Sequence, residues 1–176
     1  MIINTSRFGK VELMSEDLIQ FPEGLLGFAD LRQFVLLDDP NDEIFAWLQS
    51  CETPAVAFPV LEPELFIENH KTNLTKSDMA SLKITEDNKA KLHFFSIITI
   101  PEDPTQMTAN LKAPVVINIE LKLARQCVLQ DNHLAIREPI FAKLQQRVVQ
   151  NPNVSIKHQS AGIDVATPLK ERLAEI

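Results

Sequence analysis

The chain has 176 residues, a formal net charge of −7 and 45% hydrophobic residues, with two cysteines and no tyrosine. This length fits one domain, or one domain with a tail, and the composition is that of a globular protein. No uninterrupted apolar run approaches the ~18 residues of a membrane span. The N-terminus lacks a basic head followed by an apolar run, so no signal peptide is predicted. We therefore expect a cytoplasmic protein without membrane contact.

Charge is unevenly distributed along the chain. Residues 1–88 hold 6 Lys+Arg and 16 Asp+Glu, whereas residues 89–176 hold 11 and 8. This balance argues against direct nucleic-acid binding, because backbone phosphates attract a basic surface. The densest acidic cluster has two interpretations: it attracts a basic protein partner, or it is a solvated face that maintains solubility. Its members are Asp38, Asp39, Asp42 and Glu43.

No motif typical of catalysis or metal binding is evident in the sequence. A GxSxG elbow, an HExxH helix, a phosphate loop and a GxGxxG turn are all missing. The histidines stand singly, at His70, His93, His133 and His158. Cys51 and Cys127 lie far apart and are predicted to be reduced core residues. The sequence therefore predicts no cofactor, no metal and no enzymatic activity.

Most of the chain is predicted to form β-strands. Apolar residues recur at every second position over 115–123, the period of a half-buried strand. We expect this strand to continue over 125–129, with a tight hairpin at Asp131-Asn132 leading into 133–137. A second hairpin is expected between 81–85 and 91–100. Further strands are expected at 8–14, 17–21, 33–37, 45–49 and 55–61, where Pro59 indicates an edge or a bulge.

Helices are few in this interpretation. Thr75, followed three residues later by Asp78, predicts a capped helical turn that ends near residue 80. Glu138-Pro139 is expected to open a second helix, because Pro139 would occupy a position that needs no donor. Its apolar residues at helical spacing are Ile140, Leu144 and Val148. Thr167-Pro168 is expected to cap a final turn that places Leu169, Leu173 and Ile176 on one face.

These elements predict a mainly β fold, a small antiparallel β-barrel-like domain over residues 1–149 with one to three short helices. Closing such a sheet removes its exposed edges. Residues 150–176 form a C-terminal extension. A flexible arm with a short terminal helix and a disordered terminus both remain open for it.

Two segments carry the most specific information: Phe21-Pro-Glu-Gly-Leu-Leu-Gly-Phe28 and Thr108-Ala-Asn-Leu-Lys-Ala-Pro-Val-Val-Ile-Asn118. Together with Leu48-Gln-Ser50, Phe58-Pro-Val60 and Gln126-Cys-Val-Leu129, they resemble the FliW family of flagellar assembly factors, in the same order along the chain. The resemblance implies a β-barrel-like fold without catalysis. It also implies two protein partners, namely flagellin and the carbon storage regulator CsrA, which represses translation of messengers that include the one for flagellin. A FliW-like protein holds CsrA off the message until unassembled flagellin competes for it.

The candidate partner-binding residues are Asp38, Asp39, Asp42, Glu43, Asn110, Leu111 and Asn118. Each motif residue also has a structural interpretation: the two asparagines can bond local backbone, and Leu111 can belong to the core. Gly24 and Gly27 are expected to permit tight turns. Two other functions stay open: a flagellin secretion chaperone without a translational role, and an enzyme or small-ligand carrier that uses the barrel interior.

Overall fold

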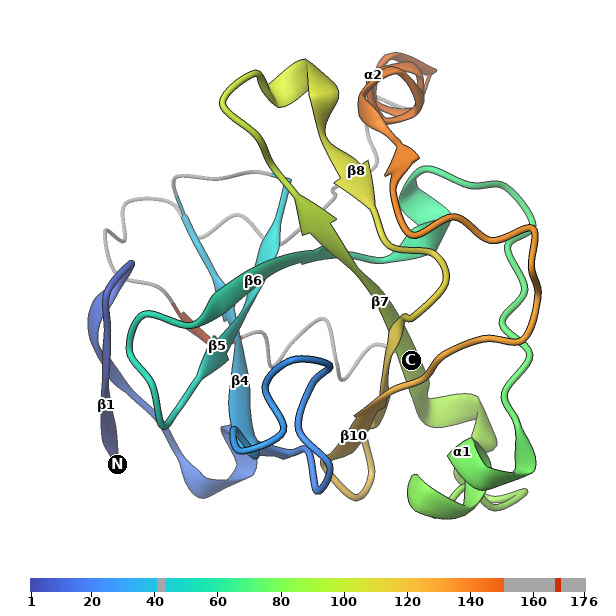
Figure 1. The fold of residues 1–176 in the computed structure, drawn as a ribbon. Helices are drawn as coiled ribbons and strands as arrows, with labels where there is room; N and C mark the ends of the chain where they lie inside the picture. The colour runs from blue at the N-terminus through green and yellow to red at the C-terminus, as the bar shows by residue number, and fades with distance from the viewer. Residues whose placement is uncertain (41–43, 151–166, 169–176) are drawn as a thin grey trace.

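Seven strands close into a barrel in the computed structural model, which describes residues 1–40, 44–150 and 167–168 (Figure 1). In chain order they are β3 (Ile19–Gln20), β4 (Gln33–Asp38), β5 (Ala46–Ser50), β6 (Ala57–Leu61), β7 (Leu92–Thr99), β9 (Val115–Asn118) and β10 (Leu123–Gln126). Neighbours around the barrel are antiparallel except β3 and β10, which run parallel where Gln20 lies opposite Leu123. The predicted mainly β barrel is confirmed, with this one parallel pair as a correction.

The barrel interior is filled by side chains from alternate strand positions. On β9, Val115 and Ile117 join the interior cluster, whereas Val116 packs outside with Leu82 and Cys127. The interior also contains three fully or nearly buried phenylalanines, Phe21, Phe34 and Phe95. Because large side chains from opposite walls meet there, the barrel is a packed core.

Smaller elements cover the barrel from outside. The hairpin of β1 (Ile2–Thr5) and β2 (Gly9–Glu12) packs on the outer face of β4. A short ladder extends β7 through β8 (Thr108–Ala109) to β11 (Glu138–Pro139). Helix α2 (Phe141–Gln150) follows and buries Leu144 against a second apolar cluster. Helix α1 (Lys76–Ser81) lies at the other end of the molecule (Figure 1).

The remaining short elements connect or edge these structures. Single 3₁₀ turns lie at Ser15–Asp17, Pro63–Leu65, Lys89–Lys91 and Pro104–Gln106. Strand β12 (Thr167–Pro168) pairs antiparallel with β4. It corrects the expected helix cap at Thr167-Pro168, whereas the expected helical face at Leu169, Leu173 and Ile176 lies outside the described residues.

Several predicted elements are confirmed. The strands expected at 33–37, 45–49, 55–61 and 91–100 correspond to β4, β5, β6 and β7. Strand β6 is not an edge strand, since it pairs with both β5 and β7. Pro59 nevertheless lies opposite Trp47 of β5, outside the two residues that pair with β7. The capping box is also confirmed: Thr75 Oγ1 accepts from Asp78 N at 3.0 Å, and Asp78 Oδ2 accepts from Thr75 N at 3.1 Å.

The long strand predicted over 115–123 is wrong. The chain reverses after Asn118, and Lys122 takes a positive φ of 52°, so that β10 folds back onto β9. The hairpin predicted at Asp131-Asn132 is also wrong. Residues 133–137 form no strand, although Asp131 does close a local turn by accepting from His133 N at 2.9 Å.

Two further expectations are corrected around the helices. Residues 81–85 do not form a strand: α1 runs to Ser81, and Asn88 then bonds the backbone of Thr85 and Lys83 in a turn. Glu138-Pro139 belongs to β11, and α2 begins at Phe141. Proline suits this edge position because a short outer strand can omit a donor.

Candidate functional site

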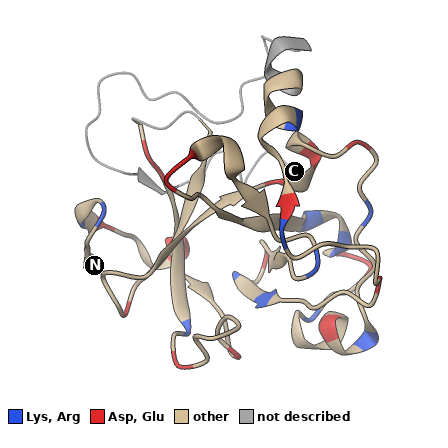
Figure 2. Cartoon of the chain, turned by 45° about the horizontal axis from the view of Figure 1, so that its top comes forward, with Lys and Arg blue, Asp and Glu red and all other residues tan. Residues whose placement is uncertain are grey.

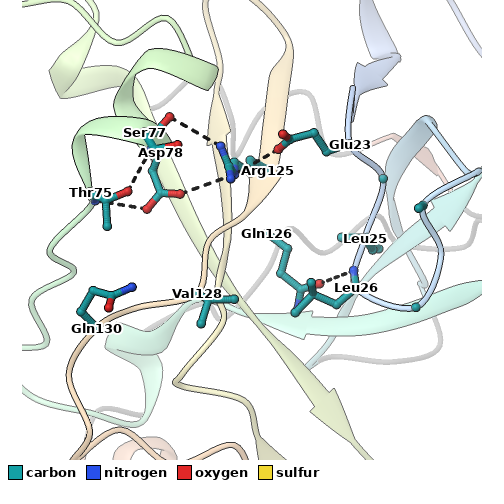
Figure 3. A pocket seen from close by; sticks show the side chains of 13 residues that line it. Glu23, Leu25, Leu26, Thr75, Ser77, Asp78, Arg125, Gln126, Val128 and Gln130 are labelled. Carbon is teal, nitrogen blue, oxygen red and sulfur yellow. Dashed lines mark hydrogen bonds and ion pairs between the residues drawn. The ribbon is translucent and has the colours of Figure 1, made fainter.

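A surface groove of about 460 Å³ lies where three distant segments meet (Figure 3). One wall is the loop 23–29, which belongs to the first specific segment of the sequence. The opposite wall is the start of α1, and the floor is the end of β10 with the residues that follow it. The lining residues are Glu23, Gly24, Leu25, Leu26, Gly27, Ala29, Thr75, Ser77, Asp78, Arg125, Gln126, Val128 and Gln130.

The loop 23–29 depends on its two glycines. Gly24 and Gly27 adopt φ values of +66° and +83°, which confirms the expected tight turns. Around Gly27 the chain turns tightly, and Phe28 N donates to Leu25 O at 2.8 Å. This turn buries Leu25 in the barrel core and leaves Leu26 at the surface.

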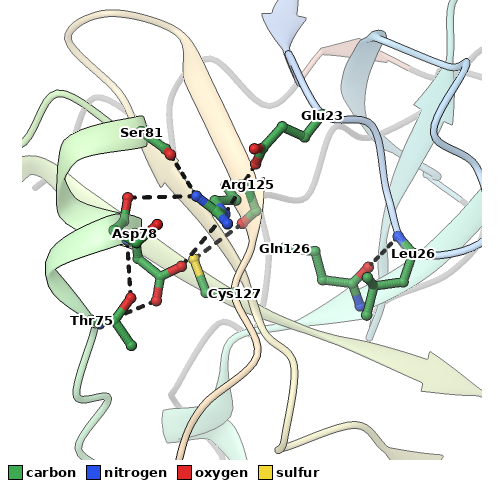
Figure 4. Close-up of polar contacts among 9 residues, drawn as sticks. Glu23, Leu26, Thr75, Asp78, Ser81, Arg125, Gln126 and Cys127 are labelled. Carbon is green, nitrogen blue, oxygen red and sulfur yellow. Dashed lines mark hydrogen bonds and ion pairs between the residues drawn. The ribbon is translucent and has the colours of Figure 1, made fainter.

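An ion-pair network crosses the groove at Arg125 (Figure 4). Its Nε lies 3.1 Å from Glu23 Oε2 and 3.5 Å from Asp78 Oδ1, so the guanidinium connects the loop to α1. Nη1 donates to Ser77 O at 3.5 Å and to Ser81 Oγ. Asp78 is buried, whereas the Glu23 side chain is 60% exposed. Glu23 therefore presents the charge of this network to solvent.

Gln126 fixes the loop to the barrel. Its Oε1 accepts from Leu26 N at 2.9 Å, and its Nε2 donates to Ala113 O at 3.1 Å. One amide side chain thus joins the first specific segment of the sequence to the second. The loop 23–29 is therefore held by hydrogen bonds against the end of β10, which forms the floor of the groove.

Apolar side chains stand exposed around this polar network. Leu26 is 59% exposed and Val128 is 45% exposed, and both line the groove. Protein–protein contact surfaces combine apolar groups with a polar rim, and Leu26 and Val128 supply exposed apolar groups here. These residues lie within the quoted sequence segments, but their meeting depends on the barrel and was not predicted.

The acidic cluster lies on a different part of the barrel. Asp38 is buried at the end of β4, and the carboxylate of Asp39 lies 3.9 Å from the Arg7 guanidinium. Arg7 also lies 3.7 Å from the centroid of the Trp47 ring. Asp42 and Glu43 lie outside the described residues. Figure 2 shows Lys, Arg, Asp and Glu on several elements of the described chain.

The three motif residues make internal contacts. Asn110 Oδ1 accepts from the backbone N–H groups of Lys112 and Ala113 at 3.1 and 3.0 Å. Leu111 is buried in the cluster under α2. Asn118 is fully buried and donates to Leu82 O at 2.8 Å. Leu111 and Asn118 therefore hold neighbouring elements of the structure in place.

Replacing Asn110 by alanine should lower the free energy of unfolding by about 1–3 kcal/mol, because two half-buried backbone donors lose their acceptor. Asn110→Asp retains the oxygen and serves as the matched control. Urea unfolding measures both changes. Unchanged stability combined with weaker partner binding would instead assign Asn110 to a partner contact.

The two cysteines are shielded thiols. Burial raises the pKa of Cys51 to about 11 and that of Cys127 to about 12, with nearby Glu52 and Asp78 adding to the respective effects. The residues that the structure describes contain no group of three or more His, Cys, Asp or Glu placed to hold a metal ion. Among the same residues, no helix is both long enough and apolar enough to cross a bilayer.

The barrel and the groove together define a small β-barrel protein with a surface groove built from three segments of the chain. Residues 2–140 match the family model described as FliW protein. The chain is 75% identical over 169 residues to the flagellar assembly factor FliW of Bdellovibrio bacteriovorus, covering 96% of this chain and 95% of the relative. It is 35% identical over 140 residues to a flagellar assembly factor FliW of Leptospira interrogans, covering 79% and 92%.

A solved structure gives the same result. The crystal structure of the flagellar assembly factor FliW superposes with a TM-score of 0.72 at 30% identity, covering 79% of this chain and 96% of that one. The chain belongs to the FliW family of flagellar assembly factors.

Proposed function

We propose that this protein regulates flagellin synthesis by binding, without catalysis, the translational repressor CsrA and unassembled flagellin. Its family membership supports a role in flagellar assembly. The observation that carries the proposal within the molecule is the groove, which is lined by exposed Leu26 and Val128 and by the charged Glu23.

The chemistry of the groove suits a segment of protein. Burying the exposed aliphatic groups of Leu26 and Val128 against a partner would release water from apolar surface. Glu23 remains largely exposed although it contacts Arg125, so it can also accept from a basic side chain. An RNA-binding repressor carries such basic side chains. The packed barrel holds the loop and the floor in place, which limits the ordering cost of binding.

The barrel interior gives less support to a small-ligand carrier. Phe21, Phe34 and Phe95 fill it together with aliphatic side chains, and Phe21 packs edge-on against Phe34 at 5.0 Å between centroids. A carrier site would combine an internal cavity with convergent polar groups. The groove described above lies outside this interior.

Replacing both Leu26 and Val128 by aspartate should weaken binding of at least one partner by about tenfold or more, because each change removes apolar contact and adds a desolvated charge. Isothermal titration of purified CsrA, and separately of flagellin, into the full chain measures this effect. The matched control is Ile136→Asp, since Ile136 is 65% exposed but does not line the groove.

The titrations also separate the remaining alternatives. Heat with both partners, reduced in the groove variant and retained in the control, supports the proposal. Flagellin binding without CsrA binding would select a secretion chaperone that lacks a translational role. Unchanged affinity of the groove variant for both partners would contradict the assignment of the groove.

A further inference from the structure

One stretch of the barrel wall has an edge that the neighbouring barrel strand does not cover. Strand β4 pairs with β5 from Phe34 to Asp38. On its other side, β3 covers only Gln33 and Phe34, because β3 is two residues long. No barrel strand therefore pairs with residues 35–38 of β4 on the side that faces β3. This stretch is called the distal edge of β4.

A segment from the C-terminal extension lies on this edge. Thr167 of β12 is opposite Asp38, and Pro168 is opposite Leu37, in antiparallel register. Proline has no N–H and cannot donate to the ladder. The pair that can donate in both directions is therefore Thr167 and Asp38. A contact of two residues with a proline in it provides few hydrogen bonds. We therefore expect it to open more readily than the strand pairs of the barrel.

The receiving edge belongs to a buried and packed strand. Leu37 is fully buried and Asp38 nearly so. Val35 and Leu37 pack beneath the β1–β2 hairpin with Ile3, Val11 and Leu13. An edge that is already packed loses little conformational freedom when a strand is added to it.

The occupant lies beyond the residues that the family model matches, since that match ends at residue 140. The FliW relative from Bdellovibrio bacteriovorus, in contrast, is similar over 96% of this chain.

We propose that the distal edge of β4 is a strand-acceptor site, and that Thr167–Pro168 is its internal occupant. The same segment of a second copy of this chain would add to the edge through backbone hydrogen bonds after displacing β12. Strand β12 thereby acts as an autoinhibitory strap that keeps this edge of β4 from pairing with other chains. This inference is independent of the proposed function, since the groove is built from loop 23–29, α1 and β10.

Thr167→Pro in the full chain tests the strap, because it removes the one remaining donor of the two-residue strand. Thr167→Val is the matched control, since valine retains the N–H and favours extended backbone. Hydrogen exchange followed by NMR should show the Asp38 amide exchanging about tenfold faster or more in the proline variant. The valine variant should exchange like the unchanged chain.

A labelled peptide with the sequence of residues 163–172 then probes the edge in trans. Fluorescence anisotropy should show it binding the proline variant at least about tenfold more tightly than the unchanged chain, because the internal competitor is lost. A peptide of the same composition in scrambled order is the control. Equal protection of the Asp38 amide in all three chains would overturn the strap, and equal binding of the two peptides would overturn the acceptor site.

Discussion

Gly24→Ala should lower the free energy of unfolding by about 2–4 kcal/mol, as measured by urea denaturation. Two effects combine at this position. The left-handed backbone, at φ +66°, disfavours any residue with a Cβ. An added Cβ would also lie 2.4 Å from Phe28 O and 2.7 Å from Ala29 Cα, and both of these neighbours are backbone atoms. The loop must therefore move, which also distorts the wall of the groove.

Gly9→Ala separates the two effects. Gly9 has a similar φ of +69°, but a Cβ built there meets nothing within 4 Å. We expect a loss of about 1–2 kcal/mol for this variant, from the backbone conformation alone. If both alanine variants lose the same stability, close packing of the 23–29 loop does not explain the requirement for glycine.

Phe34→Ala should have the second large effect, a loss of about 3–5 kcal/mol in the free energy of unfolding. Phe34 is fully buried in the barrel, and its ring packs edge-on against Phe21 at 5.0 Å between centroids. Its removal leaves a cavity between strands that are bonded on both sides and cannot collapse freely. Differential scanning calorimetry and urea denaturation both measure this loss.

Phe28→Ala is the matched control for that prediction. Phe28 also makes an edge-on contact, with Phe58 at 5.3 Å, but it is 37% exposed. The same change of side chain should therefore cost less than about 2 kcal/mol. Similar losses at Phe28 and Phe34 would mean that the barrel interior is not the main source of stability.

Local sequence patterns predicted the straight parts of the fold well. Strands β4, β5, β6 and β7 occupy segments rich in apolar residues, and the α1 cap follows from Thr75 and Asp78. Turn positions were harder to predict. The reversal after Asn118 places Lys122 at positive φ, although the turn contains neither glycine nor asparagine to indicate it. Apolar residues continue to alternate through this turn, so the pattern predicted one long strand where the chain reverses.

Local sequence patterns could not predict the groove. Glu23, Asp78 and Arg125 come from three separate parts of the chain and meet because β10 pairs with β3 in parallel, next to the loop. The acidic cluster, which local composition did indicate, became a buried Asp38 and an Asp39 paired with Arg7 within the described residues. Charge along the sequence could not predict which carboxylates reach the surface.

The most direct test of the proposed regulatory switch is a competition between its two proposed partners, CsrA and flagellin. Fluorescently labelled CsrA is first bound to the full chain, and purified flagellin is then titrated while anisotropy is recorded. Mutually weakening binding predicts that the anisotropy falls toward that of free CsrA, with a coupling free energy of about 1–3 kcal/mol. A constant anisotropy, under conditions in which each partner binds the chain separately, would contradict the proposed switch.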